Sequence, residues 1–125
     1  MPEYKAPLRD MRFVLHELLE VEKHQNLPIF SEAPVDIIDA VLEEGAKVAE
    51  EILFPLNQVG HEEGCTFKDG EVTTPTGFKE AFAQYREGGW VGLAGNANYG
   101  GQGLPAFLGT AIGEMTCATN LAFEM

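Results

Sequence analysis

Three side chains near the N-terminus have a spacing that could bring metal ligands together. His16, Glu20 and His24 are four residues apart and would share one face of a helix. A di-iron centre in a helical bundle, however, takes a glutamate three residues before each histidine, and neither histidine has one. The spacing therefore favours a solvent-facing polar stripe, and we predict no metal site.

Nucleophilic residues are equally sparse. Ser31 is the single serine and lacks the flanking glycines of a nucleophile elbow. Cys65 follows His61 closely, as a thiol enzyme would need, but the two glutamates between them disfavour a thiolate. Cys117, late in the last predicted helix, is expected to pack against neighbouring side chains rather than to react. We therefore assign no catalytic residue to this chain.

Residues 101–106 form a glycine cluster that formally fits the G-x-G-x-x-A fingerprint of dinucleotide-binding proteins. That fingerprint works only after a buried strand and inside a β-α-β unit. The preceding residues 92–99 are too rich in glycine and asparagine for such a strand. We interpret the cluster as a turn that leads into a helix.

Composition and charge exclude several classes of function. The chain has 125 residues, 45% hydrophobic and 22% charged, as expected for one small globular domain. Its net charge of −12 argues against nucleic acid and anionic membranes as partners. Residues 31–71 carry eleven acidic and two basic groups. This stretch is either a solvated helix face or a docking surface for a basic partner.

Cysteine usage and hydropathy bear on location. Two cysteines without CxxC spacing do not make a disulfide scaffold. No apolar run approaches the roughly 20 residues of a membrane span, and no signal-peptide pattern opens the chain. We expect a soluble, cytoplasmic protein with reduced thiols and no membrane span.

Apolar periodicity predicts two helices in the first half of the chain. The first follows Pro7, has Asp10 as its N-cap and ends near residue 26. The second covers residues 34–56, and Pro55 should kink or end it. The apolar stripe expected to bury the first helix consists of Met11, Val14, Leu15, Leu18 and Leu19.

The second half should hold a hairpin and two further helices. Asp69-Gly70 between short strand-like flanks indicates a two-residue hairpin turn. Thr74-Pro75 is expected to begin the third helix, which Gly88-Gly89 would stop. The fourth opens at Pro105 and should turn three side chains inward: Leu108, Ile112 and Met115. The predicted fold is all-α, a small bundle of about four to five helices with a short β-hairpin insertion.

Residues 89–115 resemble a known family. The strings Gly89-Trp90-Val91-Gly92-Leu93, Tyr99-Gly100-Gly101-Gln102-Gly103-Leu104-Pro105 and Gly113-Glu114-Met115 resemble the N-terminal helical domain of acyl-CoA dehydrogenases. Residues 4–13 and 72–78 look like the larger bacterial subgroup similar to 3-methylmercaptopropionyl-CoA dehydrogenase. The resemblance covers nearly all of residues 1–125, with an N-terminal extension helix and connector in 1–33 and the core in 34–125.

The resemblance implies an enzyme in which a glutamate removes the acyl α-proton and a hydride leaves the β-carbon for FAD. It also implies that a middle β domain and a C-terminal helical domain, absent from this sequence, hold the flavin and supply that glutamate. Glu114 and Glu124 are not assigned this role. We expect a shortened chain or a fragment, inactive alone and without flavin. The implied partners are acyl-CoA, the missing domains, an electron-accepting protein and further copies of the enzyme.

By the same resemblance, this region supplies part of the wall around the acyl chain. Phe123 and Met125 are the expected apolar liners, although packing in the core or at a domain interface is as good an interpretation. Tyr99, Gly100 and Gly101 are expected to approach the same pocket from their loop.

A function of another class stays open. The chain could be a non-enzymatic, acidic helical interaction module. It would dock either through the helix face carrying Ile38, Val41 and Ile52 or through its acidic surface.

Overall fold

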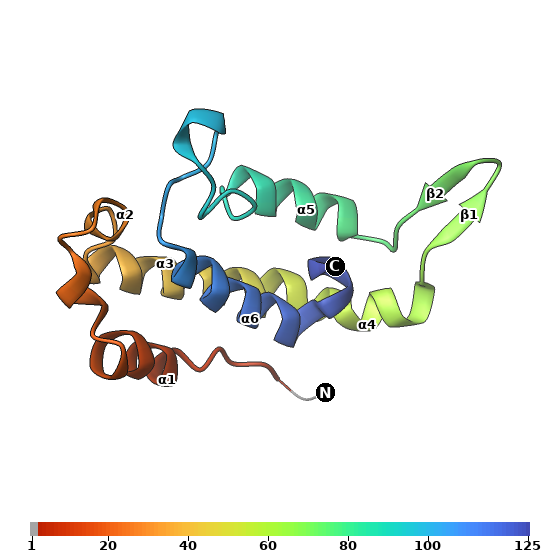
Figure 1. Cartoon of the computed structure of the whole chain (residues 1–125). Helices are drawn as coiled ribbons and strands as arrows, with labels where there is room; N and C mark the ends of the chain where they lie inside the picture. Colours follow the sequence, from red (N-terminus) through yellow and green to blue (C-terminus); the bar gives the residue numbers. More distant parts are fainter. Residues whose placement is uncertain (1–2) are drawn as a thin grey trace.

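The computed structural model describes residues 3–125 and is mainly helical, with one two-stranded antiparallel hairpin. A long helical rod runs through the molecule, α6 lies along it, and the hairpin projects beyond one end (Figure 1). The all-α prediction with a hairpin insertion is confirmed. Within the described residues, no helix is long and apolar enough to cross a membrane.

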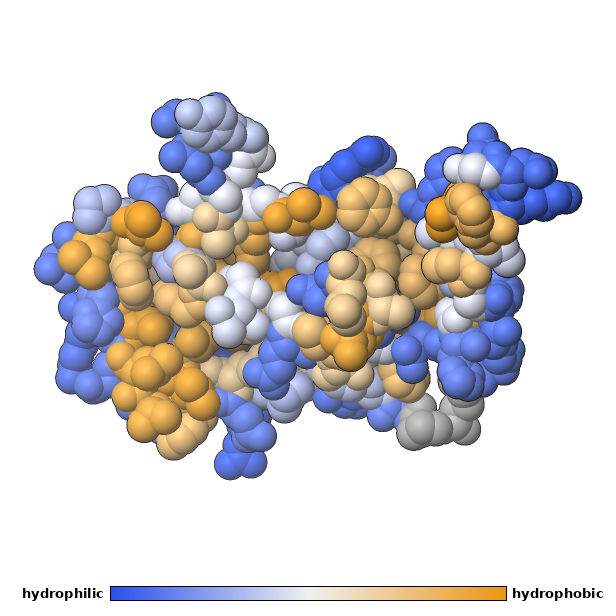
Figure 2. All heavy atoms as spheres, turned by 45° about the vertical axis from the view of Figure 1, so that its right-hand side comes forward, coloured by the Kyte–Doolittle hydropathy of each residue, from blue (hydrophilic) through white to orange (hydrophobic). Residues whose placement is uncertain are grey.

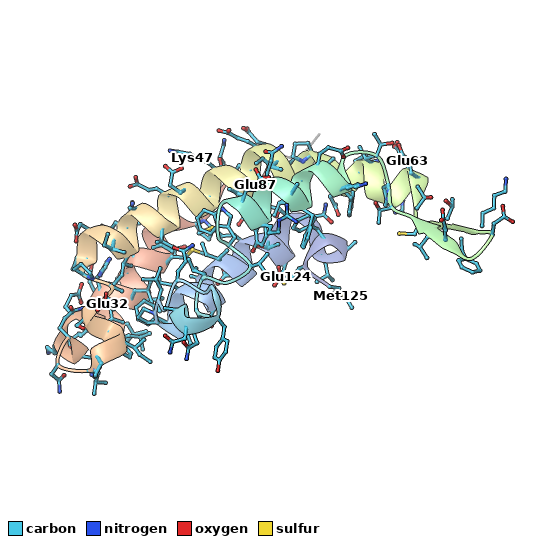
Figure 3. The ribbon with its side chains drawn as sticks, turned by 90° about the horizontal axis from the view of Figure 1, so that it is seen from above. Glu32, Lys47, Glu63, Glu87, Glu124 and Met125 are labelled. Carbon is cyan, nitrogen blue, oxygen red and sulfur yellow. The ribbon has the colours of Figure 1, made fainter. Side chains whose placement is uncertain are left out.

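The rod consists of α3 (Val35–Lys47), the π-helical turn η3 (Val48–Leu53) and α4 (Phe54–Glu63). Of the two outcomes predicted for Pro55, a kink or an end of the helix, the end is wrong, because the helix continues to Glu63. Pro55 lies in the first turn of α4, directly after η3. A π-turn holds one extra residue, which lets a helix pass a proline whose missing N–H would otherwise interrupt the hydrogen-bond ladder. Seen from above, the rod passes through Lys47 to Glu63 (Figure 3).

The core lies between this rod and α6 (Ala106–Glu124). Ile38, Leu42, Leu108 and Met115 are fully buried there. The inward placement of Leu108, Ile112 and Met115 is therefore confirmed. Ile38 faces this core and is fully buried, so of the three residues named in the interaction-module hypothesis this one is not available to a partner.

The N-terminal segment is not the single helix that its apolar stripe predicts. It contains α1 (Leu8–Arg12), the π-turn η1 (Phe13–Leu18), the 3₁₀ turn η2 (Val21–His24) and the short α2 (Pro28–Ser31). Glu20 interrupts it in the left-handed conformation, with φ of 47°. Pro7 rather than Asp10 occupies the N-cap position. Of the stripe, Met11 and Leu15 are buried, whereas the other three members are exposed.

The hairpin pairs β1 (Thr66–Lys68) with β2 (Glu71–Thr73), as predicted. Asp69 and Gly70 both have positive φ, at 54° and 84°, which fits the tight turn that a two-residue hairpin prefers. Every strand residue is exposed.

The third helix begins later than predicted. α5 spans Phe78–Glu87, and the residue before it is Gly77, with φ of 86°, rather than Thr74. The Pro75 carbonyl accepts a hydrogen bond from the Phe78 N–H at 3.2 Å, so residues 75–78 form a separate turn. The predicted stop at Gly88-Gly89 is confirmed.

A charged cluster ties the N-terminal segment to α3. His16 Nδ1 lies 2.5 Å from a Glu22 carboxylate oxygen, and Nε2 lies 3.0 Å from Asp39 Oδ1. Arg12 donates to Asp39 at 3.2 Å and also to Glu43. A carboxylate at each ring nitrogen favours the protonated imidazole, in which neither nitrogen offers a lone pair to a metal.

The other members of the predicted polar stripe are held elsewhere. Glu20 pairs with Lys23 at 2.6 Å, and His24 packs edge-on against Phe30 with the ring centroids 5.7 Å apart. Among the residues that the structure describes, no group of His, Cys, Asp and Glu has the arrangement of a metal site.

The histidine of this cluster should make stability depend on pH. Burial opposes its charge, but the hydrogen bonds to Asp39 and Glu22 outweigh burial and raise the pKa of His16 above 6.5. Burial also opposes the charge of Asp39, yet His16 and Arg12 hold the pKa of that carboxyl below 3.8. The stabilisation that the His16 and Asp39 charges give the folded chain is therefore complete between about pH 3.8 and pH 6.5. It is lost as pH rises through the raised His16 pKa and as pH falls through the lowered Asp39 pKa.

We expect His16→Gln to lower the free energy of unfolding by about 1 kcal/mol at pH 6. The deficit should shrink as the pH rises, because the wild-type chain then loses its cationic histidine as well. Urea unfolding monitored by circular dichroism across this range measures the effect. The exposed His61→Gln is the control. Wild-type and H16Q stabilities that stay parallel at every pH would contradict this role.

Candidate functional site

An apolar hollow of about 400 Å³ lies between α5, residues 90–95 and α6. It contains Phe123, one of the residues predicted to line an acyl pocket. Most of its lining is aromatic or aliphatic, and includes Phe82, Tyr85, Trp90, Leu93, Ile112 and Phe123. Such a surface is suited to an apolar ligand.

Phe123 is held by the aromatic face of α5. Its ring lies 5.4 Å from Tyr85 at an angle of 78°, and 6.2 Å and 6.4 Å from Phe78 and Phe82. These edge-on and tilted contacts are the arrangements that aromatic rings prefer. The helical spacing of the three α5 rings is visible in the sequence, but it did not indicate that Phe123 would meet them.

Asn120 sets the position of Phe123, and sequence reasoning did not single it out. Its backbone leaves the helical conformation inside α6, with φ of −157° and ψ of 83°. The side chain is 1% exposed, donates to the Leu53 carbonyl at 3.2 Å and accepts from the Phe123 N–H at 3.1 Å. The backbone of α6 therefore changes direction at Asn120, and the Asn120 side chain caps the turn that follows by accepting from the Phe123 N–H. The available signal was that Asn120 is the single amide residue of α6.

Two ionisable groups line the hollow, and neither is a cation. Burial raises the pKa of Tyr85, although its hydrogen bond with Thr116 opposes this, so the phenol stays neutral. Glu124 lies next to Phe123 on the last turn of α6. A neutral phenol and a carboxylate in an apolar wall do not attract a phosphate group.

The other predicted site residues lie apart from Phe123. Tyr99, Gly100 and Gly101 line a second hollow of about 400 Å³ on the glycine-rich loop. Tyr99 is 91% exposed and precedes Gly100 at the end of the 3₁₀ turn η4 (Ala97–Tyr99). Met125 lines neither hollow and is 96% exposed at the end of α6 (Figure 3).

The two hollows nevertheless adjoin. Val91 and Gly95 line both of them, so the glycine-rich loop is their shared wall. A ligand that extends past Phe123 would reach this loop next.

The glycine-rich loop satisfies its own backbone. The N–H groups of residues 101–104 donate, in order, to the carbonyls of Asn96, Gly92, Gly95 and Leu93 at 2.9–3.1 Å. None of the four is left to bind a phosphate, in contrast to a dinucleotide-binding turn. The interpretation of this cluster as a turn before a helix is confirmed, since α6 follows Pro105 directly.

Gly101 is required by the crossing of the loop on itself. A Cβ at this position would run into the backbone carbonyl group of Gly95. The two glycine-containing segments can therefore approach only because both lack side chains there.

Both cysteines are exposed and free. The expectation that Cys117 packs in the core is wrong, because this residue lies on the outer face of α6. The helical phase that buries Ile112 and Met115 turns Cys117 away from the rod.

Comparison with known proteins identifies the family. No family model matches the sequence. The chain is 34% identical over 122 residues, 98% of its length, to 3-methylmercaptopropionyl-CoA dehydrogenase of Ruegeria pomeroyi. It is 32% identical over 90 residues, 69% of its length, to butyryl-CoA dehydrogenase of Syntrophomonas wolfei. The chain belongs to the acyl-CoA dehydrogenase family.

The acyl-CoA dehydrogenase relatives are much longer proteins. The matches cover 21% of the first and 15% of the second, so this chain spans about a fifth of their length or less. Most of what an acyl-CoA dehydrogenase of that size contains therefore has no counterpart among these residues.

The flavin that the acyl-CoA dehydrogenase resemblance implies does not fit the hollow around Phe123. A dinucleotide needs donors for its pyrophosphate. The hollow is lined by no lysine or arginine, and the N–H groups of residues 101–104 are bonded within the loop. No residue of this hollow is therefore assigned to FAD, and its apolar lining fits a hydrocarbon chain better.

Replacing the buried amide tests its structural role. We expect Asn120→Ala to lower the free energy of unfolding by about 1–3 kcal/mol, because it removes two hydrogen bonds and leaves the Leu53 carbonyl without this donor. Urea unfolding measures the loss. Asn98→Ala, at an exposed position of η4, is the control. Equal stability of the two variants would show that Asn120 does not hold the end of α6.

A methyl group tests the loop crossing. We expect Gly101→Ala to lower the free energy of unfolding by about 1–3 kcal/mol through the clash with Gly95. Gly109→Ala is the matched control, because its Cβ would make an ordinary 3.7 Å contact with the Cβ of Ala94, and because alanine favours the helix at this position of α6. Thermal unfolding of both variants is the measurement. A G101A chain as stable as wild type would rule out the close crossing.

Proposed function

We propose that this chain is the N-terminal helical domain of an FAD-dependent acyl-CoA dehydrogenase and that the hollow around Phe123 forms part of the wall of its acyl site. Residues 1–33 would be an extension of that domain and residues 34–125 its core. The observation that carries the proposal is an aromatic hollow beside Phe123, in a chain matched over 98% of its length by such a dehydrogenase.

The proposed contribution is binding rather than bond breaking. The intact enzyme would oxidise an acyl-CoA thioester between its α- and β-carbons, with FAD accepting the hydride. No group in the hollow is proposed as the base, and Glu124 is proposed only as a rim residue. Alone, the chain should therefore bind an acyl chain without oxidising it or retaining flavin. The intact enzyme would pass its electrons to an acceptor protein and act as a homo-oligomer.

The site residues take different parts in this proposal. Phe123 lines the hollow, where its ring contacts Tyr85 and its backbone N–H is bonded to the Asn120 side chain. Tyr99, Gly100 and Gly101 lie in the adjoining hollow and would meet the further part of the ligand. Met125 would contact the acyl chain or a neighbouring domain from outside, which its exposure allows.

Trp90 provides the test, because it is the only tryptophan and it lines the hollow. We expect octanoyl-CoA to change its fluorescence in a saturable way, with CoA alone giving no change. Phe123→Ala should weaken binding at least tenfold, because about 1.5–3 kcal/mol of apolar contact is lost when a large side chain is removed.

The matched control is Phe67→Ala, which removes a phenylalanine that is 74% exposed on the hairpin. It should leave octanoyl-CoA binding unchanged. Equal weakening by F123A and F67A, or the same response to CoA alone, would contradict an acyl site in this hollow.

A further inference from the structure

The outward face of α6 carries almost no charge. Along residues 107–118 this face consists of Phe107, Thr110, Ala111, Glu114, Cys117 and Ala118, and Glu114 is its only acidic or basic residue. The opposite face is already buried against the rod. A helix that is apolar on both faces is typical of one covered on both. The described residues cover the outward face only in part: Phe107 packs on Phe30 and is half-buried, whereas Thr110, Glu114 and Ala118 are exposed.

This face forms one wall of an apolar groove of about 380 Å³. The other wall comes from α1 and η1, through Met11, Val14, Leu15 and Leu19. Val14 and Leu19 are 39% and 51% exposed, although they belong to the stripe expected to be buried. Figure 2 shows apolar side chains gathered over the end of the molecule that carries these N-terminal elements. Both walls are helical, so the groove has the shape that receives a third helix.

The charged lining of the groove has one sign. Asp10 and Glu114 are its only ionisable residues, and neither makes an ion pair with another residue of the described chain. The nearby Arg12 is held by Asp39 and Glu43 on α3. An occupant with acidic groups would be repelled, and a wholly apolar one would strip water from two carboxylates without pairing them.

We propose that this groove binds a basic amphipathic helix. Its leucine-type side chains would lie between Val14, Leu19 and Phe107, and a lysine or arginine would pair with Asp10 or Glu114. Residues 107–118 extend over about 16 Å, so roughly three turns of the partner would be in contact. This interaction goes beyond acyl binding and uses a different surface.

The test uses a fluorescein-labelled 15-residue peptide with a leucine stripe and lysines on its flanks, and fluorescence anisotropy at about 150 mM salt. A scrambled peptide of the same composition reports attraction by charge alone. We expect the amphipathic peptide to bind at least tenfold more tightly than the scrambled one.

Two pairs of variants locate the binding. Val14→Gln should weaken it about fivefold, whereas Val35→Gln, at a position of nearly equal exposure on α3, should not. Glu114→Gln should weaken it two- to fivefold, as loss of an exposed ion pair does, whereas the exposed Glu87→Gln should not. Circular dichroism confirms that each variant is folded.

Several results would overturn the proposal. Equal binding of the scrambled peptide would show that the peptide is attracted by its charge alone and that the groove does not recognise a helix. Equal effects of V14Q and V35Q would place the peptide elsewhere. A concentration-dependent dimer that V14Q abolishes would make a second copy of the chain the occupant. The Trp90 titration reports on the other hollow, so failure of either proposal leaves the other standing.

Discussion

The close approach of α6 to the α3–α4 rod is the constraint on which the rest of the structure depends. It is possible because Gly45 has no side chain where Ile112 crosses it, so a Cβ there would collide with the isoleucine. The crossing buries Leu42, Leu108 and Met115 completely. It also fixes which residues of α6 remain outside: one flank faces α5 and closes the hollow at Phe123, and the other faces η1 and forms the groove. A change that separated these helices would alter both surfaces at once.

The hollow and the glycine-rich loop illustrate two ways of satisfying polar backbone near an apolar site. At the end of α6, the Asn120 side chain takes over where helical bonding stops. In the loop, glycines permit the chain to cross itself, and its carbonyls accept the N–H groups that would otherwise face a ligand. Both devices leave the surrounding wall apolar, which suits a hydrocarbon chain and excludes a phosphate cradle.

The parts of the fold that follow from short-range pattern were predictable from the sequence. The hairpin follows from Asp69-Gly70, and the inward face of α6 follows from the spacing of Leu108, Ile112 and Met115. What failed depended on long-range or irregular geometry. Glu20 breaks the first helix with a left-handed backbone for which its residue type gives no warning, and the π-turn before Pro55 is invisible to a periodicity of 3.6.

The candidate site was predicted only in part for the same reason. The family resemblance directed attention to Phe123, but the residues that surround it, Tyr85 and Trp90 among them, come from segments distant in sequence. Spacing along the chain says nothing of how α5 lies against the end of α6. Asn120 could have been found as the single amide residue of α6, because a buried polar side chain usually makes hydrogen bonds to the protein around it.

The π-turn η3 determines how far α4 is rotated about the rod axis relative to α3. Each residue of a helix adds about 100° of rotation, so the extra residue at 48–53 sets the angular phase of α4 relative to α3. This rotation also determines the direction in which the hairpin leaves the far end of the rod, because the hairpin follows α4 directly. The loss or gain of one residue in η3 would rotate that whole end of the molecule, whereas the same change at the hairpin tip would alter only its reach. Among homologues of this chain, insertions and deletions should therefore occur at residues 69–70 and be absent from residues 48–53.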